Sequence, residues 1–221
     1  VYKRQGFSNG YDGSLGQERA LVIDLEGAMP AFPGVPQSVV DSAKFPRATW
    51  IAPVQDRAKL AGAWKKMNGS MTNMAATISE MIDKDFPMQK PLSSDKDDSK
   101  TWFFPLPFFN DDFLPSVTVN DNWFAASTSK LQAVDLIKQA EAGGDTSQGM
   151  VMKVNFKRLQ AYVKEMAAMV EKNADDLHAP EEGLKMAKQI IEAFSDMDSM
   201  NMHVRREKGQ LRSSFHFKVA E

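Results

Sequence analysis

The sequence of 221 residues contains no cysteine and only three histidines. Without cysteine, this chain cannot form disulfide bonds, cysteine-ligated zinc sites, iron–sulfur clusters or a thiol nucleophile. No apolar run in the sequence reaches the roughly 18–20 residues that a membrane-spanning helix needs. The 27 lysines and arginines are balanced by 29 aspartates and glutamates, giving a formal net charge of −2. This balance argues against a protein that binds nucleic acid by charge.

The motifs of several common enzyme classes are also missing. The sequence has no G-x-S-x-G, no H-E-x-x-H and no phosphate-binding G-x-x-x-x-G-K-[ST]. Ser127-Thr128-Ser129-Lys130 fits the S-x-x-K of serine acyl-enzymes, but the companion S-D-N and K-T-G elements are absent. Serine and threonine at a strand-to-helix junction are typical helix caps, so capping is the favoured role. The sequence therefore predicts no catalytic residue, no metal and no cofactor.

The first five residues, Val1–Gln5, have an unusual match at the nucleotide level. They are the residues that GTG TAT AAG AGA CAG encodes, which resembles the end of a transposase adapter used for sequencing libraries. We expect residues 1–5 to be an adapter-derived scar on a metagenomic fragment. A genuine basic N-terminus is the alternative. Residues 6–18 are rich in Gly, Ser and Asn and are expected to be a loop or the end of a truncated element.

Apolar periodicity predicts a mixture of strands and helices in the rest of the chain. Strands are expected over residues 20–26, 47–54, 100–107, 115–120, 122–128 and 148–155, and in a hairpin around Lys208-Gly209. Helices are expected over residues 56 to about 82, over 129–141, after Asn155 and after Pro180, with Asp56 and Asn155 as N-caps. Residues 27–46 and 86–99 are expected to be connections, the first with at most one short helix around Gln37–Ser42. This order predicts an α+β fold, with antiparallel sheet and helices packed on one face.

The order of elements also repeats in outline. We expect a single α+β domain over residues 19–221, with two similar halves at about 47–141 and 148–221. Each half reads as strand, helix and then further strands, which indicates an internal β-α-β-β duplication.

Methionine is abundant, with 14 residues, and thioethers are soft ligands that suit Cu(I). However, Met150, Met152, Met200 and Met202 alternate in phase with apolar neighbours such as Val154. Alternation of this kind predicts one buried face on the strands, and methionine fills irregular cores well. We therefore expect these methionines in the core, and Cu(I) binding is the open alternative.

Aromatic residues are concentrated in one short stretch of the chain. They would point to both faces of a strand, so either a second layer covers that strand or one face binds an apolar ligand. Missing N-terminal sequence is the favoured cover. The candidate ligand-binding residues are Trp102, Phe103, Phe104, Phe108, Phe109 and Phe113.

Basic side chains share the face of the C-terminal hairpin that the alternation predicts to be exposed to solvent. Such a patch could contact an anionic ligand, a lipid headgroup or a polyanion, although a solvated sheet face ordinarily carries charges of this kind. The members of the patch are His203, Arg205, Arg212, His216 and Lys218.

Two short stretches resemble repeats in uncharacterised bacterial extracytoplasmic proteins, known as domains of unknown function. These are Trp50–Arg57, followed by a long helix, and Trp123–Ser129, followed by a short one. The resemblance carries no catalytic motif. It implies an exported, non-enzymatic protein located in the periplasm or on the cell surface.

Three hypotheses for function follow from the sequence. The first is a non-catalytic structural or binding module of an exported bacterial protein. Its expected partners are a hydrophobic ligand, an envelope component or the missing N-terminal part of the same chain, and not nucleic acid. The second is a carrier of a hydrophobic ligand that uses the aromatic segment 102–113. The third is part of an enzyme whose catalytic residues lie in the missing N-terminal region.

Overall fold

The structure is a computed structural model that describes residues 13–66, 91–104, 108–143, 149–174 and 181–219. Several expectations lie outside these residues. They are the adapter-derived residues 1–5, the first part of the loop over 6–18, the second half of the long helix after Asp56, and Pro180 as the start of a helix.

The chain divides into two compact units, and the division does not follow a single cut. One unit joins the residues up to Asp24 with Arg47–Ala142, and the other joins Leu25–Pro46 with Gly143–Glu221. No feature of the sequence indicated that residues 25–46 belong with the C-terminal residues.

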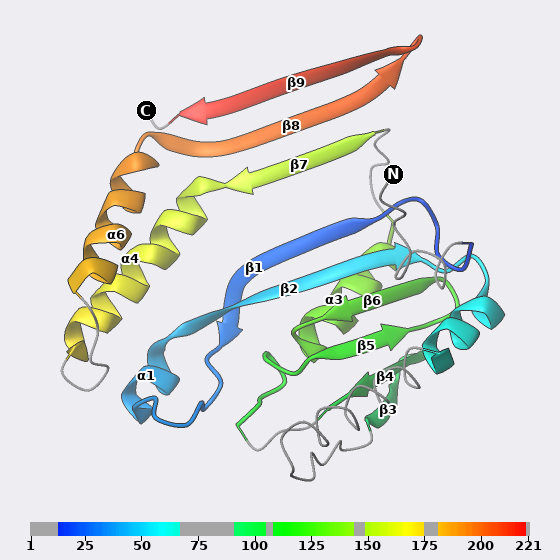
Figure 1. Cartoon of the computed structure of the whole chain (residues 1–221), viewed down its shortest axis with the longest axis horizontal. Helices are drawn as coiled ribbons and strands as arrows, with labels where there is room; N and C mark the ends of the chain where they lie inside the picture. The colour runs from blue at the N-terminus through cyan, green and yellow to red at the C-terminus, as the bar shows by residue number, and fades with distance from the viewer. Residues whose placement is uncertain (1–12, 67–90, 105–107, 144–148, 175–180, 220–221) are drawn as a thin grey trace, which may run out of the picture. The chain divides into compact units, whose positions relative to one another are not determined.

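A six-stranded sheet with the order β1-β2-β6-β5-β4-β3 contains the named strands that the structure describes before residue 130 (Figure 1). The pairings β2–β6, β6–β5, β5–β4 and β4–β3 are antiparallel. The strands are β1 Ala20–Ala28, β2 Lys44–Pro53, β3 Leu92–Lys96, β4 Ser99–Phe103, β5 Ser116–Val119 and β6 Trp123–Ser127.

Helices cover both faces of this sheet in the first unit. Helix α3, Lys130–Glu141, packs on one face, where Ile137 joins Ile51 and Ala125 in a buried cluster. The helix over residues 57–66 packs on the opposite face, where Leu60 joins a second cluster. The α+β class with antiparallel sheets is confirmed, and the 57–66 helix supplies a layer in addition to the one that the sequence indicated.

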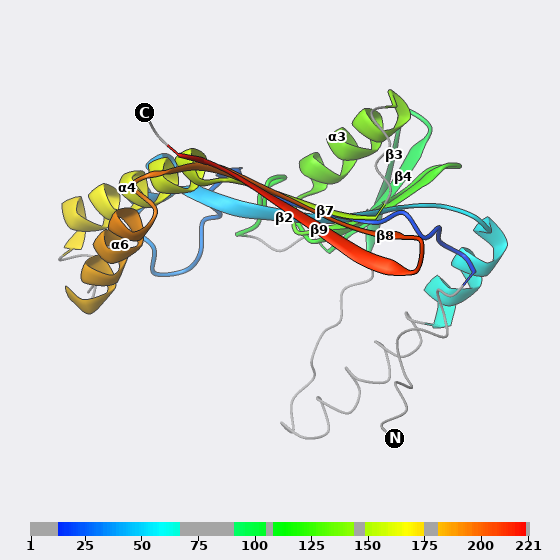
Figure 2. The ribbon, with the colours of Figure 1, turned by 90° about the horizontal axis from the view of Figure 1, so that it is seen from above.

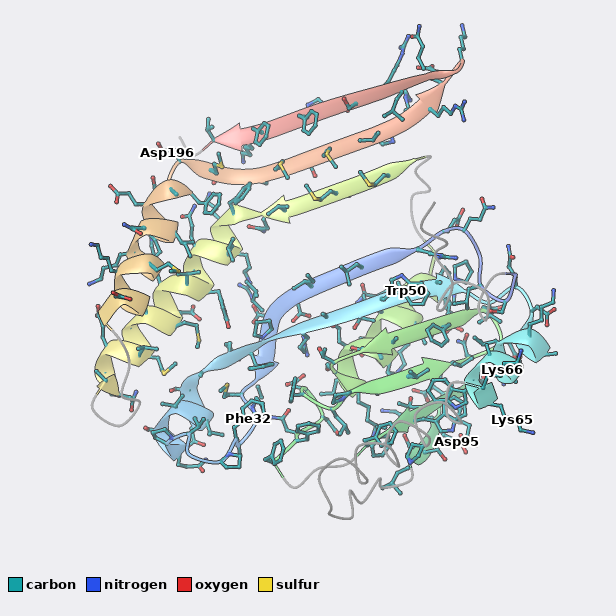
Figure 3. The ribbon with its side chains drawn as sticks, viewed as in Figure 1. Phe32, Trp50, Lys65, Lys66, Asp95 and Asp196 are labelled. Atoms are coloured by element: carbon teal, nitrogen blue, oxygen red, sulfur yellow. The ribbon has the colours of Figure 1, made fainter. Side chains whose placement is uncertain are left out.

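The two clusters bury adjacent residues of β2 on opposite faces of the sheet, Ile51 in the first and Ala52 in the second. Ala52, Phe124 and Val119 are buried in the second cluster, and Trp50 packs on it with its ring 5.7 Å from that of Phe124 (Figure 3). Leu15, within the expected loop over residues 6–18, is also buried there and forms an isolated bridge with Val54.

The expectation of a loop over residues 86–99 is wrong where the structure describes it. Leu92–Lys96 form the edge strand β3, which pairs with β4 through a turn in which Asp97 and Asp98 have φ values of 48° and 60°. Aspartate tolerates this left-handed conformation better than most residues. The polar sequence did not predict this strand, because an edge strand can be held by backbone hydrogen bonds without an apolar pattern. The expected strand over 100–107 likewise ends earlier, at Phe103.

The second unit contains a three-stranded antiparallel sheet with the order β7-β8-β9. Figure 1 and Figure 2 show α4 and α6 past one end of the strands rather than over a face. Phe156 and Phe194 stack with ring centroids 5.0 Å apart and join the two helices at that end. The elements are β7 Met150–Asn155, α4 Phe156–Lys172, α6 Glu181–Ala193, β8 Met197–Glu207 and β9 Gln210–Val219.

Residues 25–46 complete the second unit. They contain the short helix α1, Gln37–Ser42, at the position that the sequence allowed. Ser38 Oγ donates to Asn173 Oδ1 at 2.8 Å, and the Tyr162 hydroxyl donates to the Lys44 carbonyl at 3.2 Å. Glu26 forms an ion pair with Arg158. These contacts join α1 and the adjoining parts of β1 and β2 to α4.

Local signals in the sequence are confirmed at the helix starts and in the C-terminal hairpin. Asp56 Oδ1 accepts from the backbone N–H of Lys59, Ser129 Oγ from that of Gln132, and Asn155 Oδ1 from that of Arg158. Lys208 and Gly209 both have positive φ, as the two central residues of a type I′ hairpin turn require.

The strand order does not repeat between the two units. The strand before the 57–66 helix, β2, pairs with the last described strand of its unit, β6. The strand before α4, β7, pairs with the first strand of the following hairpin, β8. The internal duplication stays a prediction of the sequence.

Candidate functional site

The aromatic segment is divided between the two faces of β4. Trp102 packs against the buried cluster below the 57–66 helix, and its ring lies 5.8 Å from that of Trp64. Phe103 points to the opposite face, where Lys130 Nζ of α3 lies 4.5 Å from the centre of its ring. A helix of the same chain therefore lies against each of these residues, and the expectation that missing N-terminal sequence covers them is wrong.

The remaining aromatic residues contact one another beyond β4. The ring centroids of Phe108 and Phe109 are 4.8 Å apart, and those of Phe109 and Phe113 are 4.9 Å apart, both in edge-to-face geometry. Phe104 follows β4 directly and is half-buried. These contacts give the segment a packing role in the first unit, because edge-to-face pairs stabilise a fold beyond their buried area.

The register of the second sheet places the five predicted basic residues on one face, here called the basic face. Arg205 lies directly opposite Arg212, and His203 lies opposite Ser214. His216 lies opposite Asn201, and Lys218 opposite Ser199. Lys153 of β7, opposite Asn201 on its other side, extends the same face.

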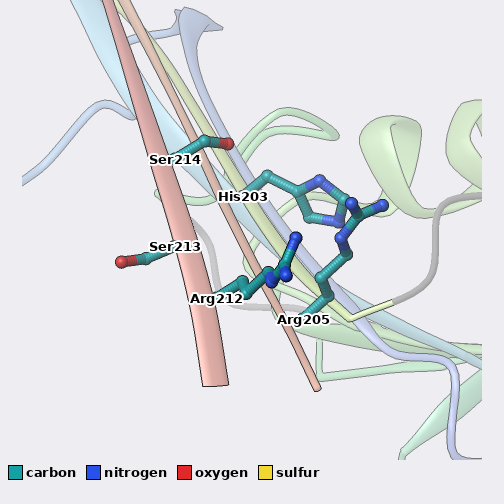
Figure 4. Close-up of a pocket in the computed structure, with 5 residues that line it drawn as sticks. All are labelled: His203, Arg205, Arg212, Ser213 and Ser214. Carbon is teal, nitrogen blue, oxygen red and sulfur yellow. The ribbon is translucent and has the colours of Figure 1, made fainter. Parts of the chain in front are cut away.

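A pocket of about 290 Å³ opens on the basic face at the hairpin end. His203, Arg205 and Arg212 line it together with Ser214, and their side chains project to the same side (Figure 4). The neighbouring Ser213 projects to the other side of the sheet. Two guanidinium groups and a hydroxyl group that converge in this way can donate hydrogen bonds to an oxyanion such as a carboxylate.

Carboxylates of the same sheet already contact the basic face. Glu207 Oε2 lies 3.1 Å from Arg212 Nη1 and 3.7 Å from Arg205 Nη2. Asp198 lies 3.5 Å from Lys218 Nζ through Oδ2 and 3.0 Å from Lys157 Nζ through Oδ1. The cations of this face outnumber these two carboxylates, and their side chains are exposed to solvent.

The buried carboxylate of Asp198 should make this sheet sensitive to acid. Its pKa is lowered, chiefly by the hydrogen bond from Lys157 and further by Lys218. A lowered pKa in the folded state contributes stability above the unfolded-state value of about 4, which is lost as the pH falls through the folded-state value. The unsubstituted protein should therefore lose protection of its β8 amides against hydrogen exchange, measured relative to the intrinsic exchange rate, below about pH 4, and Asp198→Asn should abolish this pH dependence.

The neighbouring exposed residue provides the control for that experiment. Asp196→Asn should keep the acid-dependent exchange of β8, because Asp196 contacts Ser195 rather than the basic face. Equal acid dependence in the Asp198→Asn variant and the unsubstituted protein would contradict this role of Asp198.

The opposite side of the sheet, here called the apolar face, contradicts the expectation of a buried surface. Three cross-strand rows form it: Val154–Met200–Phe217, Met152–Met202–Phe215 and Met150–Val204–Ser213. The exposed fractions are 56% for Met150, 55% for Phe215 and 56% for Phe217. Sulfur atoms gather along β7 and β8 in Figure 3. Alternation predicted the composition of this face, but the helices of the unit lie past its end and leave it exposed.

The serine of the S-x-x-K motif, Ser127, is hydrogen-bonded within the strand-to-helix junction. Ser127 Oγ lies 2.6 Å from Thr49 Oγ1 and accepts from the backbone N–H of Ser129 at 2.9 Å. Lys130 Nζ lies 3.9 Å from Asp111 and over the ring of Phe103. These contacts fix the strand-to-helix junction, as the capping interpretation predicted.

A polar network next to this junction was not foreseen from the sequence. Arg47 donates to both carboxylate oxygens of Asp24 at 2.9 Å, and to Asp112 Oδ1 at 2.6 Å. Gln132 Nε2 donates to Asp24 Oδ2 at 2.7 Å, and Thr49 Oγ1 donates to Gln132 Oε1 at 2.6 Å. The hydrogen bond to Asp24 is the main cause of the raised pKa of Arg47. The network joins β1, β2, α3 and the turn before β5, so its role is structural.

Comparison with known proteins gives no relative on which to base a function: no family model, curated protein or solved structure matches the chain. Within the described part of the chain, no three His, Asp or Glu side chains are grouped so that they could hold a metal ion. The described helices include none with the length and apolarity required to cross a membrane.

Proposed function

We propose that the chain is a non-catalytic binding module of an exported bacterial protein, and that the β7–β8–β9 sheet binds a protein partner. The observation that carries the proposal is the exposed apolar face, with Met150, Phe215 and Phe217 each more than half exposed. Contiguous exposed apolar surface marks interaction sites in soluble proteins.

The shape of the surface favours a protein over a small ligand. Small apolar ligands are usually bound in concave cavities that bury most of their surface. The apolar face consists instead of three adjacent strands, and neither α4 nor α6 of the same unit lies over it (Figure 2). A broad face of this kind can contact the broad surface of a partner. Methionine adds side chains that adapt to the shape of the partner.

Other observations support the non-catalytic and exported parts of the proposal. The serine of the S-x-x-K motif is hydrogen-bonded within the strand-to-helix junction. Export rests on the resemblance of Trp50–Arg57 and Trp123–Ser129 to extracytoplasmic proteins, and a position in the periplasm or on the cell surface is part of the same proposal.

A neutral apolar fluorophore, N-phenyl-1-naphthylamine, tests whether the apolar face is the binding surface. We expect its fluorescence to rise with the full chain and to fall by about half or more in the variant Phe215→Ser/Phe217→Ser. The reason is that each phenylalanine contributes a large exposed apolar area to the face. Leu92→Ser/Leu131→Ser is the matched control, since both leucines are exposed in the first unit. No fluorescence change with the unsubstituted chain would overturn the proposal.

Native mass spectrometry separates a protein-binding surface from a lipid carrier. We expect the purified chain to have its bare mass. A co-purified adduct of lipid mass that the Phe215→Ser/Phe217→Ser variant loses would overturn the choice of a protein partner in favour of a hydrophobic ligand.

A further inference from the structure

The outer edge of β9 is the longest open edge of the β7–β8–β9 sheet. β9 runs for ten residues, Gln210–Val219, and in the described residues it pairs with β8 alone. All ten residues are exposed, and none is proline. An edge strand presents a row of backbone N–H and C=O groups to which a further strand can bind. The other edge of this sheet, β7, has six residues.

The side chains of β9 differ in chemistry between the two faces of the sheet. Phe215, Phe217 and Val219 continue the apolar face, and each is more than half exposed. Arg212, His216 and Lys218 alternate with them on the basic face. A strand added beside β9 would place its own alternate side chains next to each of these two rows.

Charge disfavours a second copy of β9 as the added strand. The ionisable side chains of β9 are Arg212, His216 and Lys218, and β9 carries no carboxylate. If two copies paired antiparallel with matching faces, basic side chains would lie opposite or diagonal to basic side chains. Like charges in such positions destabilise a sheet.

We propose that the β9 edge binds an extended segment of a partner protein in which acidic and apolar residues alternate. The added strand would pair with the backbone of β9, place its carboxylates beside Arg212 and Lys218, and continue the apolar face beside Phe215 and Phe217. This is β-strand addition, in which main-chain hydrogen bonds give affinity and alternate side chains give specificity. The inference rests on the proposed function, because it names the partner chemistry for the same sheet.

The structure contains an internal example of the required contact. Glu207 of β8 lies directly opposite Gln210 of β9, diagonal to Arg212, and its carboxylate reaches Arg212 Nη1 at 3.1 Å. An acidic residue on a strand at the outer side of β9 would occupy the mirror position. The existing pairs with Glu207 and Asp198 do not prevent this, because Arg212 and Lys218 are 62% and 74% exposed. An exposed cation gains little from such a pair and can exchange its partner, and Asp198 keeps Lys157 as a partner.

Fluorescence anisotropy with labelled peptides and the full chain tests the proposal. We expect saturable binding of a peptide in which Glu and Val alternate over about nine residues, roughly the length of β9. A Lys/Val peptide of the same length should bind at least tenfold more weakly. A Glu/Val peptide methylated at every backbone nitrogen should also bind at least tenfold more weakly, because it keeps the charges but cannot donate main-chain hydrogen bonds.

Charge reversal on β9 provides the matching change in the protein. The variant Arg212→Glu/Lys218→Glu should bind the Glu/Val peptide at least tenfold more weakly than the unsubstituted chain does. It should bind the Lys/Val peptide more tightly. Lys164→Glu/Lys185→Glu makes the same change of charge on exposed positions of α4 and α6 and should alter neither affinity. A circular dichroism spectrum confirms that both variants are folded.

The outcomes distinguish this inference from the proposed function. If the neutral fluorophore binds the apolar face but the Glu/Val peptide does not bind, the strand-addition proposal fails and the binding module stands. If neither binds, both fail. Equal binding of the N-methylated peptide, with displacement by inorganic pyrophosphate, would overturn strand addition in favour of a simple anion site at the pocket of His203, Arg205 and Arg212.

Discussion

Replacing Arg47 by methionine is expected to lower the free energy of unfolding of the first unit by about 3 kcal/mol. Arg47 is 17% exposed and lies between Asp24 and Asp112, which are 31% and 18% exposed. Methionine keeps most of the aliphatic stem but leaves both carboxylates without their cation. A charge left unpaired in a partly buried site costs far more than an exposed ion pair contributes.

Tryptophan fluorescence isolates this effect, since all four tryptophans, at positions 50, 64, 102 and 123, belong to the first unit. Urea unfolding followed by their emission should therefore report that unit alone. Arg57→Met is the control, because the ion pair of Arg57 with Asp121 is exposed on both sides. We expect the control to lose less than about 1 kcal/mol. A loss of similar size in both variants would show that Arg47 does not hold the network together.

Replacing Ile137 by alanine is expected to cost about 3 kcal/mol in the same unit. Ile137 is 1% exposed and packs with Ile51, Ala125 and Ala133 between α3 and the sheet. Its neighbours include two alanines, which cannot extend to fill the space left by the missing atoms. The cost therefore includes a cavity as well as the lost burial of apolar surface.

Leu131 provides a control on the same helix for the effect of Ile137. Leu131 is 45% exposed, so Leu131→Ala should lower the free energy of unfolding by less than about 1 kcal/mol. Alanine is a better helix former than either isoleucine or leucine, so helix propensity accounts for neither loss of stability. Equal losses in urea unfolding, followed by tryptophan emission, would contradict the placement of Ile137 in the core.

The sequence predicted the local elements that carry their own signals. Asp56, Ser129 and Asn155 cap helices because a short polar side chain before an apolar periodic run can accept from the first free N–H groups. Lys208-Gly209 closes the last hairpin because its turn requires positive φ. The strand β3 carried no such signal, because its side chains are polar and its stability comes from backbone pairing with β4.

The candidate site was predicted in part. Alternation assigned the five basic residues to one face and the methionines and phenylalanines to the other, and the register agrees with both assignments. Alternation did not reveal that the apolar face is exposed. The aromatic segment differs, because its strand residues are covered where the apolar face is exposed. Trp64 contacts Trp102 and Lys130 contacts Phe103, each from a helix whose place against the sheet could not be predicted from the sequence.

The sequence by itself determined the absence of thiol chemistry in this chain, the helix caps, the C-terminal hairpin turn and the composition of the two faces of the second sheet. These properties depend on residue type and on spacing over a few positions. Only the tertiary structure decided which apolar faces are covered, and that Arg47 joins Asp24 and Asp112 across 23 and 65 residues of sequence. The physical reason is that alternation gives two faces different chemistry, whereas burial depends on which distant element packs against each face.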